Sequence, residues 1–268
     1  MIRPGAYMMM RRSTLCGFAV LSLALLAAAA CGHLPLVEAH DEWKRSYPLS
    51  QGGTLEIRNT NGEIKVEPGE GSTVEVVARR TARASTLESA NNALKSIEIR
   101  ETASPTRIVL DSAGGMADFS FAVSREVEYS VRLPKWANVV LKTTNGEILA
   151  AGLTGSTRLE TTNGEIQALS LEGPVRADTT NGDVRLEISK LADDGIDCST
   201  TNGEIVLTLP ASAKASLTAE TNNGGIDTSG LDLKVTSKDR NDLRATIGGG
   251  GPLIKLDTTN GAIRVRGR

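Results

Sequence analysis

The sequence has few aromatic side chains and no excess of basic over acidic ones. Aromatic residues make up 3% of its 268 residues, which leaves few rings that could stack on bases or sugars. The 30 Lys and Arg residues are balanced by 32 Asp and Glu residues, so the net charge is −2 and no basic field favours a nucleic acid. We therefore expect no nucleic-acid partner.

The sequence is also poor in cysteine and histidine, which commonly form disulfides, metal sites and nucleophiles. Of its three cysteines, Cys16 lies in an N-terminal apolar run and Cys31 directly follows that run, so Cys198 has no partner for an internal disulfide. Both histidines, His33 and His40, lie shortly after the same run. The sequence has no Gly-x-Ser-x-Gly motif, phosphate-binding loop or His-based metal spacing, so we predict no catalytic residue, metal site or cofactor.

The first 30 residues have the parts of a bacterial signal peptide. Two arginines precede an apolar run at residues 15–30, which ends in three alanines and is short for a membrane span. Cys31 follows the alanines as the acylated cysteine does in a bacterial lipobox; the alternative is an ordinary secretory signal that is cut nearby. We expect residues 1–30 to be the signal peptide, Cys31 to be the lipidation site and residues 31–44 to be a tether. The protein is then expected to be exported to the bacterial cell envelope, as an outer-membrane lipoprotein that faces the periplasm or the surface.

The motif Thr-Thr-Asn-Gly-Glu-Ile organises the rest of the chain. It occurs at residues 143–148 and again at 161–166, and related copies follow. From Asn145 onward, the asparagines of successive copies are 18, 18, 21, 21 and 37 residues apart, which is a nearly fixed period with one gap of about two units. Such a period predicts a solenoid. The predicted structural turns are the Asn-Gly pairs Asn61 and Gly62, Asn145 and Gly146, Asn163 and Gly164, Asn181 and Gly182, Asn202 and Gly203, Asn223 and Gly224, and Asn260 and Gly261.

Apolar residues alternate with polar residues on both sides of each turn, as in strands that bury one face. Leu141, Leu159 and Cys198 stand four residues before their asparagines, while Ile148 and Ile166 stand three residues after theirs. We interpret Cys198 as a small buried hydrophobic side chain, because other copies carry Leu or Ala in its place. The alternative, a reactive thiol, lacks a nearby histidine or other general base.

Asn-Gly between apolar runs also favours β-hairpins, so a stack of antiparallel hairpins is the alternative fold. A parallel stack explains why threonine and asparagine recur in register. We therefore predict an all-β fold, namely a parallel β-solenoid (β-helix) of roughly 18–21-residue coils with an N-terminal β-rich lobe that carries one short helix. The last repeat is expected to form the terminal coil. Positive φ is expected at the corner glycines Gly146, Gly164, Gly182 and Gly203.

The predicted domain boundaries follow from where the regular repeats begin. Residues 45–137 are predicted to form the N-terminal β lobe, in which residues 86–96 are a short amphipathic helix with capping-box spacing at its start. Residues 138–268 are predicted to form the solenoid, with an irregular coil or bulge at residues 238–251.

Two polar columns of the repeat are candidates for binding. An acidic residue follows five of the seven asparagines by two positions. In a parallel stack these carboxylates would lie about 4.8 Å apart, where calcium could bridge them or nearby Lys and Arg could relieve their repulsion. The paired threonines could form a flat hydroxyl array that binds ice or glycans, or could serve only as strand and turn residues. We favour a solvated acidic column and structural threonines, and we expect the asparagines to form a hydrogen-bonded ladder. The acidic column comprises Glu63, Glu147, Glu165, Asp183 and Glu204.

Three segments resemble a known bacterial family. They are Gly-Gly-Thr-Leu-Glu-Ile-Arg-Asn-Thr-Asn-Gly-Glu-Ile at residues 52–64, the Leu-Pro step at 133–134 that leads into the repeats, and the Ile-Gly-Gly-Gly-Gly segment at 247–251 with the repeat that follows it. Together they resemble the bacterial "putative adhesin" family of β-strand-repeat (TTNGEI-repeat) envelope proteins, a domain of unknown function, over about residues 45–266. The resemblance implies an exported β-solenoid, often a lipoprotein, and some relatives accompany envelope-stress systems. It implies no agreed ligand and no catalytic residue.

These observations together lead us to expect a non-catalytic, adhesin-like binding or scaffold protein of the cell envelope. Its expected partners are the membrane, through the N-terminal lipid anchor, and an envelope protein or glycan. The alternatives are a carbohydrate-active β-helix enzyme, which could use two carboxylates of the acidic column, and a structural component of an envelope-stress system. The enzyme is disfavoured because a column repeated on every coil marks architecture, whereas an active site breaks a repeat.

Overall fold

The computed structural model of the protein describes residues 36–113 and 123–268. The predicted signal peptide and the predicted lipidation site, Cys31, lie outside these described residues. Pro35–Arg268 is one compact unit, built from a 10-stranded sheet and an 11-stranded sheet. No helix in the described ranges could cross a membrane, because none combines the necessary length and apolar character.

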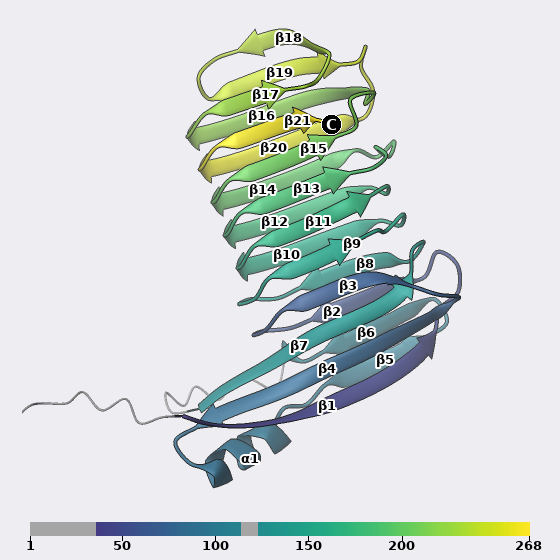
Figure 1. The fold of residues 1–268 in the computed structure, drawn as a ribbon, viewed down its shortest axis with the longest axis vertical. Coiled ribbons are helices and arrows are strands. Elements are labelled where there is room, and N and C mark those ends of the chain that lie inside the picture. Colours follow the sequence, from purple (N-terminus) through teal and green to yellow (C-terminus); the bar gives the residue numbers. More distant parts are fainter. Residues whose placement is uncertain (1–35, 114–122) are drawn as a thin grey trace, which may run out of the picture. The chain divides into compact units, whose positions relative to one another are not determined.

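Each Asn-Gly unit builds one coil from two strands (Figure 1). The strand before the turn joins the 11-stranded sheet, here called the pre-turn sheet, and the strand after it joins the 10-stranded sheet, the post-turn sheet. Alternate side chains of the strands point inward and form the core. The seven coils, in chain order, are β2 (Thr54–Arg58) with β3 (Ile64–Gly69), β8 (Asn138–Lys142) with β9 (Ile148–Ala151), β10 (Thr157–Asn163) with β11 (Ile166–Leu171), β12 (Val175–Asn181) with β13 (Val184–Ile188), β14 (Ile196–Asn202) with β15 (Ile205–Leu209), β16 (Ala215–Asn223) with β17 (Ile226–Ser229), and β20 (Leu253–Asn260) with β21 (Ile263–Gly267).

Equivalent residues of successive coils stack on one another in parallel register. Leu159 pairs with Leu141 in one neighbouring coil and with Ala177 in the other, and Ile166 pairs in the same way with Ile148. All five side chains are fully buried. The predicted parallel β-solenoid is therefore confirmed, and the repeats do not form a stack of antiparallel hairpins.

The last repeat of the sequence does not form the last coil of the stack. β20 and β21 lie between the β14–β15 coil and the β16–β17 coil, with Asn260 opposite Asn202 on one side and Asn223 on the other. The expectation that the last repeat forms the terminal coil is therefore wrong, and the β16–β17 coil holds that position. A repeat motif specifies how two coils stack but not which copies become neighbours.

An antiparallel hairpin occupies the long gap before the last repeat. It consists of β18 (Leu233–Lys238) and β19 (Asp242–Ile247), and β19 also pairs antiparallel with β16. The hairpin therefore covers the end of the pre-turn sheet and returns the chain to the interior of the stack. The irregular coil predicted at residues 238–251 is corrected accordingly, since much of that segment is β19.

At the N-terminal end of the stack, strands outside the repeats cover the first coil in both sheets. β2 lies between β6 (Arg107–Asp111) and β8, and β3 lies between β7 (Val123–Pro134) and β9. The predicted boundary at residues 137 and 138 therefore does not separate two units, because both sheets run through it. The N-terminal elements are β1 (Val37–Pro48), β4 (Thr73–Ala84), α1 (Leu87–Lys95), β5 (Arg100–Ser104), β6 (Arg107–Asp111) and β7 (Val123–Pro134).

Most of the segment predicted to be a tether forms the edge strand β1. This strand pairs antiparallel with β4 along its whole length. The tether predicted for residues 31–44 is therefore wrong from Val37 onward. Ala39 and Tyr47 bury their side chains on one face of β1, while charged residues between them hide this alternation in the sequence.

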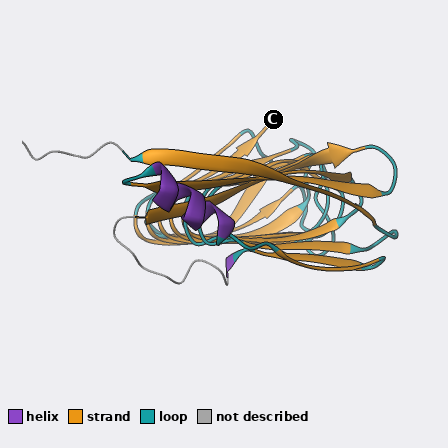
Figure 2. Cartoon of the chain, turned by 90° about the horizontal axis from the view of Figure 1, so that it is seen from below, coloured by secondary structure: helices purple, strands orange, loops and turns teal. Residues whose placement is uncertain are grey.

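The predicted helix is confirmed as α1, which packs on β4 and β1 (Figure 2). Thr86 caps its N-terminus by accepting a hydrogen bond from a backbone N–H of the first turn. Ala90 and Leu94 are buried against the strands. Leu87, in the first turn of this amphipathic helix, is 56% exposed.

The close approach of adjacent coils provides a test of the coil order. A Cβ on Gly164 would lie 1.9 Å from the carbonyl oxygen of Gly146, and a Cβ on Gly261 would lie 1.9 Å from that of Gly203. We predict that Gly164→Ala and Gly261→Ala each lower the free energy of unfolding by more than about 1 kcal/mol, because two backbones must move apart. Gly225→Ala is the control, since nothing lies within 4 Å of its Cβ position, and it should change stability by no more than about 0.5 kcal/mol. Denaturant titration measures all three, and a negligible effect of Gly261→Ala alone would contradict the interior position of the last repeat.

Candidate functional site

A continuous ladder of asparagine side chains runs along one corner of the coils. Each Nδ2 donates a hydrogen bond of 2.8 Å to the Oδ1 of the preceding asparagine in the stack. A primary amide suits this column because it carries both a donor and an acceptor. The predicted ladder is confirmed, and all seven predicted Asn-Gly pairs lie along it. In spatial order its members are Asn61, Asn145, Asn163, Asn181, Asn202, Asn260 and Asn223.

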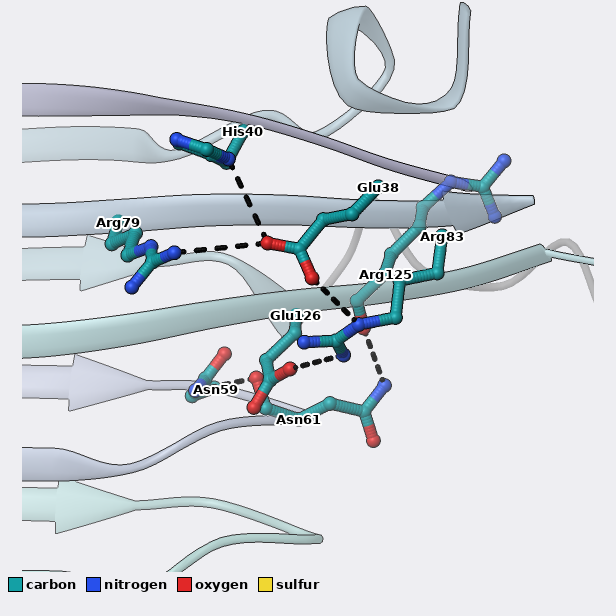
Figure 3. A network of polar contacts seen from close by, with 8 residues as sticks. All are labelled: Glu38, His40, Asn59, Asn61, Arg79, Arg83, Arg125 and Glu126. Atoms are coloured by element: carbon teal, nitrogen blue, oxygen red, sulfur yellow. Dashed lines mark hydrogen bonds and ion pairs between the residues drawn. The ribbon is translucent and has the colours of Figure 1, made fainter. Parts of the chain in front are cut away.

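The ladder begins against β7 (Figure 3). The Nδ2 of Asn61 donates to the carbonyl oxygen of Arg125 at 3.1 Å. Asn59, which takes the place of the first threonine in this coil, donates to the carbonyl oxygens of Gly62 at 3.2 Å and Val127 at 2.8 Å. The amide of Asn59 thus joins the first coil to β7, which a threonine hydroxyl could not do with its single proton.

A cluster of charged side chains lies beside the start of the ladder (Figure 3). Glu38 lies 3.0 Å from Arg83, 3.7 Å from Arg79 and 3.6 Å from His40, and Arg83 lies 2.9 Å from Glu126. These pairs link β1, β4 and β7 across the surface of the sheet. Exposed pairs of this kind contribute little to stability, and they leave no unpaired charge in the cluster that would mark a binding site.

The first threonine of each motif is buried and completes the corner. Thr200 donates to the carbonyl oxygen of Gly182 at 3.0 Å, and Thr161 donates to that of Gly146 at 3.1 Å. These hydroxyls therefore serve the contact between coils and do not reach a ligand. A flat array of two hydroxyl columns does not exist, because the first threonine of each motif is buried. The buried threonines are Thr143, Thr161, Thr179, Thr200, Thr221 and Thr258.

Glycine is required at the central corners because the backbones of adjacent coils touch there, and not because φ is positive. Among the corner glycines, positive φ occurs at Gly62 (117°) and at Gly261 (158°), and the latter is nearly extended. The expected left-handed conformation is therefore wrong for the four glycines of the central coils. The absence of a side chain instead permits the carbonyl group of one corner to touch the next glycine. The four glycines concerned are Gly146, Gly164, Gly182 and Gly203.

The second threonines line a shallow groove on the outer side of the pre-turn sheet. The groove has a volume of about 580 Å³ and crosses five coils, from β2 to β14. A second hollow of about 320 Å³ continues past Thr201 to Thr259. Each of the four coils from β8 to β14 adds the exposed hydroxyl of its second threonine, so these hydroxyls follow one another at about the strand spacing of 4.8 Å. The hydroxyls of the main groove belong to Thr144, Thr162, Thr180 and Thr201.

The charged wall of this groove changes sign along the stack. Arg58 and Lys142 line its beginning, and Glu160 and Asp178 line its middle. The carboxylate of Glu160 lies 2.7 Å from Lys142 and 2.5 Å from Arg158. Burial raises the pKa of Glu160, but the hydrogen bonds from these two cations outweigh it and hold the pKa below its ordinary value. Glu160 is therefore an ionised carboxylate, which suits ion pairing and not general-acid catalysis.

The predicted acidic column lies on the other side of the corner and is partly exposed. Glu165 pairs with Arg185 of the next coil at 2.5 Å, and Glu204 pairs with Arg264 of the coil beside it. Cations of neighbouring coils thus relieve much of the repulsion within the column. Asp183 accepts a hydrogen bond of 2.8 Å from the backbone N–H of Glu204. This arrangement is that of a solvated, ion-paired column.

Glu147 differs from Glu165 and Glu204, because it has no ion pair within the described ranges. Burial, followed by the negative charges of Glu165 and Glu63, raises its pKa above the ordinary value. Its one side-chain hydrogen bond within the described ranges comes from the amide of Gln167, at 2.9 Å. A raised carboxyl pKa is common at catalytic sites but also arises wherever like charges are stacked, as they are here.

The described ranges offer neither a metal site nor an accessible nucleophile. Residues 36–113 and 123–268 contain no group of three or more His, Cys, Asp or Glu side chains placed to hold a metal ion. Cys198 is fully buried, and burial raises the pKa of its thiol well above the ordinary value. Its interpretation as a small buried hydrophobic side chain is confirmed, since the side chain is fully buried and the raised pKa disfavours the thiolate.

Sequence reasoning missed two residues that complete the corner and the groove. Asn59 could have been found from its position two residues before Asn61, where every later copy has threonine. Arg158 carries no such signal, because its position lies outside the motif and its neighbours in the stack, Val140 and Arg176, differ in charge. Pairing of Arg158 with Glu160 becomes evident only from the structure.

The fold and the asparagine corner define the protein as a parallel β-solenoid built from in-register repeats. The model of the family described as Toastrack DUF4097 matches residues 46–266, so the chain belongs to this family. The match confirms the resemblance noted from the TTNGEI repeats. No curated protein matches the chain significantly.

Several solved bacterial structures are similar to the chain. A "putative cell adhesion protein" from Clostridium sporogenes is 15% identical, with a TM-score of 0.42 and coverage of 87% of this chain and 100% of that one. A "putative adhesin" from Bacteroides fragilis is 11% identical, with a TM-score of 0.41 and coverage of 85% and 97%. Another from Parabacteroides distasonis is 11% identical, with a TM-score of 0.33 and coverage of 84% and 97%. Likeness at this level carries no argument about what the chain binds.

The two threonines of one motif provide a matched test of the corner. Thr200→Val removes a buried hydrogen bond to a backbone carbonyl, and we predict a loss of about 0.5–1.5 kcal/mol in the free energy of unfolding. Thr201→Val makes the same chemical change at an exposed position and should stay within about 0.5 kcal/mol of the parent. Denaturant titration of both variants measures the difference, and equal losses would contradict the division into buried and exposed threonines.

The acidic column predicts a pH dependence of stability. Because the pKa of Glu147 is raised in the folded state, its favourable contribution is present below the ordinary carboxyl pKa and is lost as pH rises through the folded value. We predict that Glu147→Gln raises the Tm at neutral pH and that this gain disappears in acid. Glu165→Gln is the matched control, since it removes the ion pair with Arg185 and should give no gain at neutral pH. A gain for Glu147→Gln that is the same at both pH values would contradict the assignment.

Proposed function

We propose that the protein is an exported, lipid-anchored component of the bacterial cell envelope that binds or scaffolds a polar partner and performs no chemistry. The observation that carries this proposal is the groove lined by Thr144, Thr162, Thr180 and Thr201. The inner threonines already serve the contact between coils, so the outer hydroxyls are available to a partner. Their regular spacing suits a linear partner that lies along the stack.

The chemistry of the groove limits the class of partner. Its hydroxyls offer donors and acceptors, and its wall carries Lys142 at one end and Asp178 further along. No aromatic side chain lines it, so a partner would be held by hydrogen bonds and charge and not by stacking on rings. An envelope glycan with polar or charged substituents fits this surface, and so does an extended polar segment of an envelope protein.

Anchoring through Cys31 is supported by the sequence that precedes it, an apolar run that ends in three alanines. Metabolic labelling with a fatty-acid analogue tests this part of the proposal. The parent protein should be labelled and Cys31→Ala should not be, whereas equal labelling of the two would contradict acylation at this residue.

A carbohydrate-active enzyme is the second candidate, and the raised pKa of Glu147 beside Glu165 is the observation in its favour. Two carboxylates at about one strand spacing could in principle act as a proton donor and a nucleophile. Against this reading, the groove lies on the other side of the corner, and its own acid Glu160 is held ionised by two cations. Activity on a panel of acidic polysaccharides, lost in Glu147→Gln, would favour the enzyme.

Site-specific crosslinking in intact envelopes tests the binding surface. A photoreactive side chain placed at position 162 or 180 should capture a partner, because both threonines line the groove. The same group at position 266, an exposed residue of β21 on the post-turn sheet, is the control and should capture none. Equal capture from all three positions, or capture from position 266 alone, would contradict the proposed surface.

A further inference from the structure

The seven Asn-Gly pairs of the ladder differ in the state of the glycine N–H. In six of them this N–H donates to the carbonyl oxygen of the asparagine in the next coil, at 2.8–3.0 Å. The exception is Gly224, whose N–H makes no hydrogen bond within the described ranges. Its coil is the last of the parallel stack, so no further asparagine carbonyl lies beyond it. The six bonded glycines are Gly62, Gly146, Gly164, Gly182, Gly203 and Gly261.

The side chains of the ladder show the same asymmetry. An interior member such as Asn163 both donates to Asn145 and accepts from Asn181, at 2.8 Å in each case. Asn223 donates to Asn260 at 2.8 Å, but no group of the described ranges donates to its Oδ1. Asn61, at the other end, accepts from Asn145 and donates to a carbonyl group of β7. The C-terminal end of the stack is thus the less restrained end of the ladder.

Asn-Gly pairs are the sequence most prone to spontaneous deamidation, because glycine has no side chain to hinder attack by its own nitrogen. The glycine nitrogen attacks the asparagine Cγ and loses its proton. A bond forms between this nitrogen and Cγ, the Cγ–Nδ2 bond breaks, and Nδ2 leaves as ammonia. Water then opens the cyclic imide to aspartate or isoaspartate. The reaction needs a glycine N–H that is free and a side-chain amide that can turn toward it.

We infer that Asn223 is the site at which the folded protein deamidates, with water as the co-reactant. Attack within an interior coil must break the bond of the glycine N–H and two side-chain bonds of the ladder. Attack at Asn223 must break one side-chain bond, and its amide is exposed to solvent. An aspartate before glycine can form the same cyclic imide. At Asp194-Gly195 this attack is hindered, because the N–H of Gly195 donates to the carbonyl oxygen of Ala192 at 3.0 Å.

Modification at Asn223 acts directly on the terminal coil. A carboxylate there cannot donate to the Oδ1 of Asn260, so the last bond of the ladder is lost. Isoaspartate also adds a methylene to the main chain at a corner that packs tightly, since a Cβ on Gly224 would lie 1.9 Å from the carbonyl oxygen of Gly261. The pairing of β17 with β21, in which Ile226 lies opposite Ile263, follows this corner and would shift. Deamidation would therefore loosen the end of the post-turn sheet and leave the other coils intact.

Peptide mapping by mass spectrometry after incubation at mildly alkaline pH tests the inference. In the folded protein we expect Asn223 to deamidate about tenfold or more faster than any of the other six, because two further hydrogen bonds must break at an interior coil. In denaturant every asparagine is free and each is followed by glycine, so the seven rates should come together. Asn163 is the matched interior control.

Isoaspartate labelling of the Asn223→Gln variant provides the second measurement. Glutamine keeps an amide at this position but forms a cyclic imide far more slowly, so the folded variant should lose most of the label while the denatured variant keeps it at the remaining sites. Three outcomes would overturn the inference. They are equal rates at Asn223 and Asn163 in the folded protein, a preference for Asn223 that persists in denaturant, and label that remains unchanged in folded Asn223→Gln.

Discussion

Contact between backbones at successive corners is the constraint on which the rest of the solenoid depends. A carbonyl group of one corner lies where the side chain of the next glycine would be. The backbones of adjacent coils therefore stay about one strand spacing apart throughout the turn. This proximity brings the asparagine amides within 2.8 Å of one another and places the inner threonine hydroxyls on the glycine carbonyls. Between the interior coils, these polar groups are thus satisfied by the neighbouring coil. Stability consequently resides in interfaces between coils, as in other repeat proteins.

The repeat explains why much of the fold could be predicted from the sequence and why some of it could not. Every copy meets the same surroundings, so the inward column of Cys198, the asparagine ladder and the parallel register follow from comparing copies. The order of the coils does not follow, because Asn260 presents the same motif to Asn202 and to Asn223. The predicted φ angles of the central corner glycines are also wrong. Glycine is required either where φ is positive or where two backbones touch, and the sequence looks the same in both cases. Strand β1 was missed because Ala39 and Tyr47 alternate with charged residues and belong to no repeat.

The candidate site illustrates a further limit of sequence reasoning. The two threonines of the motif are chemically identical and adjacent, yet Thr161 serves the architecture and Thr162 faces the groove. Strand alternation separates their roles, and only a correct register assigns each threonine to its side. The inner threonine hydroxyls are used in contacts between coils, which leaves the outward columns of the pre-turn and post-turn sheets open to a partner. Those columns vary from coil to coil in charge, from Lys142 to Glu160 to Ser199, whereas the corner does not.

The interior position of the last coil has a consequence for biosynthesis. β20 and β21 are made after every other strand of the protein, yet they separate two coils that are made before them. Until β20 and β21 enter, the coils that flank them each lack a parallel neighbour that they have in the complete structure. Open parallel edges are prone to pair with other chains, so the nascent protein is most exposed to misassembly at its final step. A chain that stopped before Leu253 would lack a layer inside the stack and not at its end.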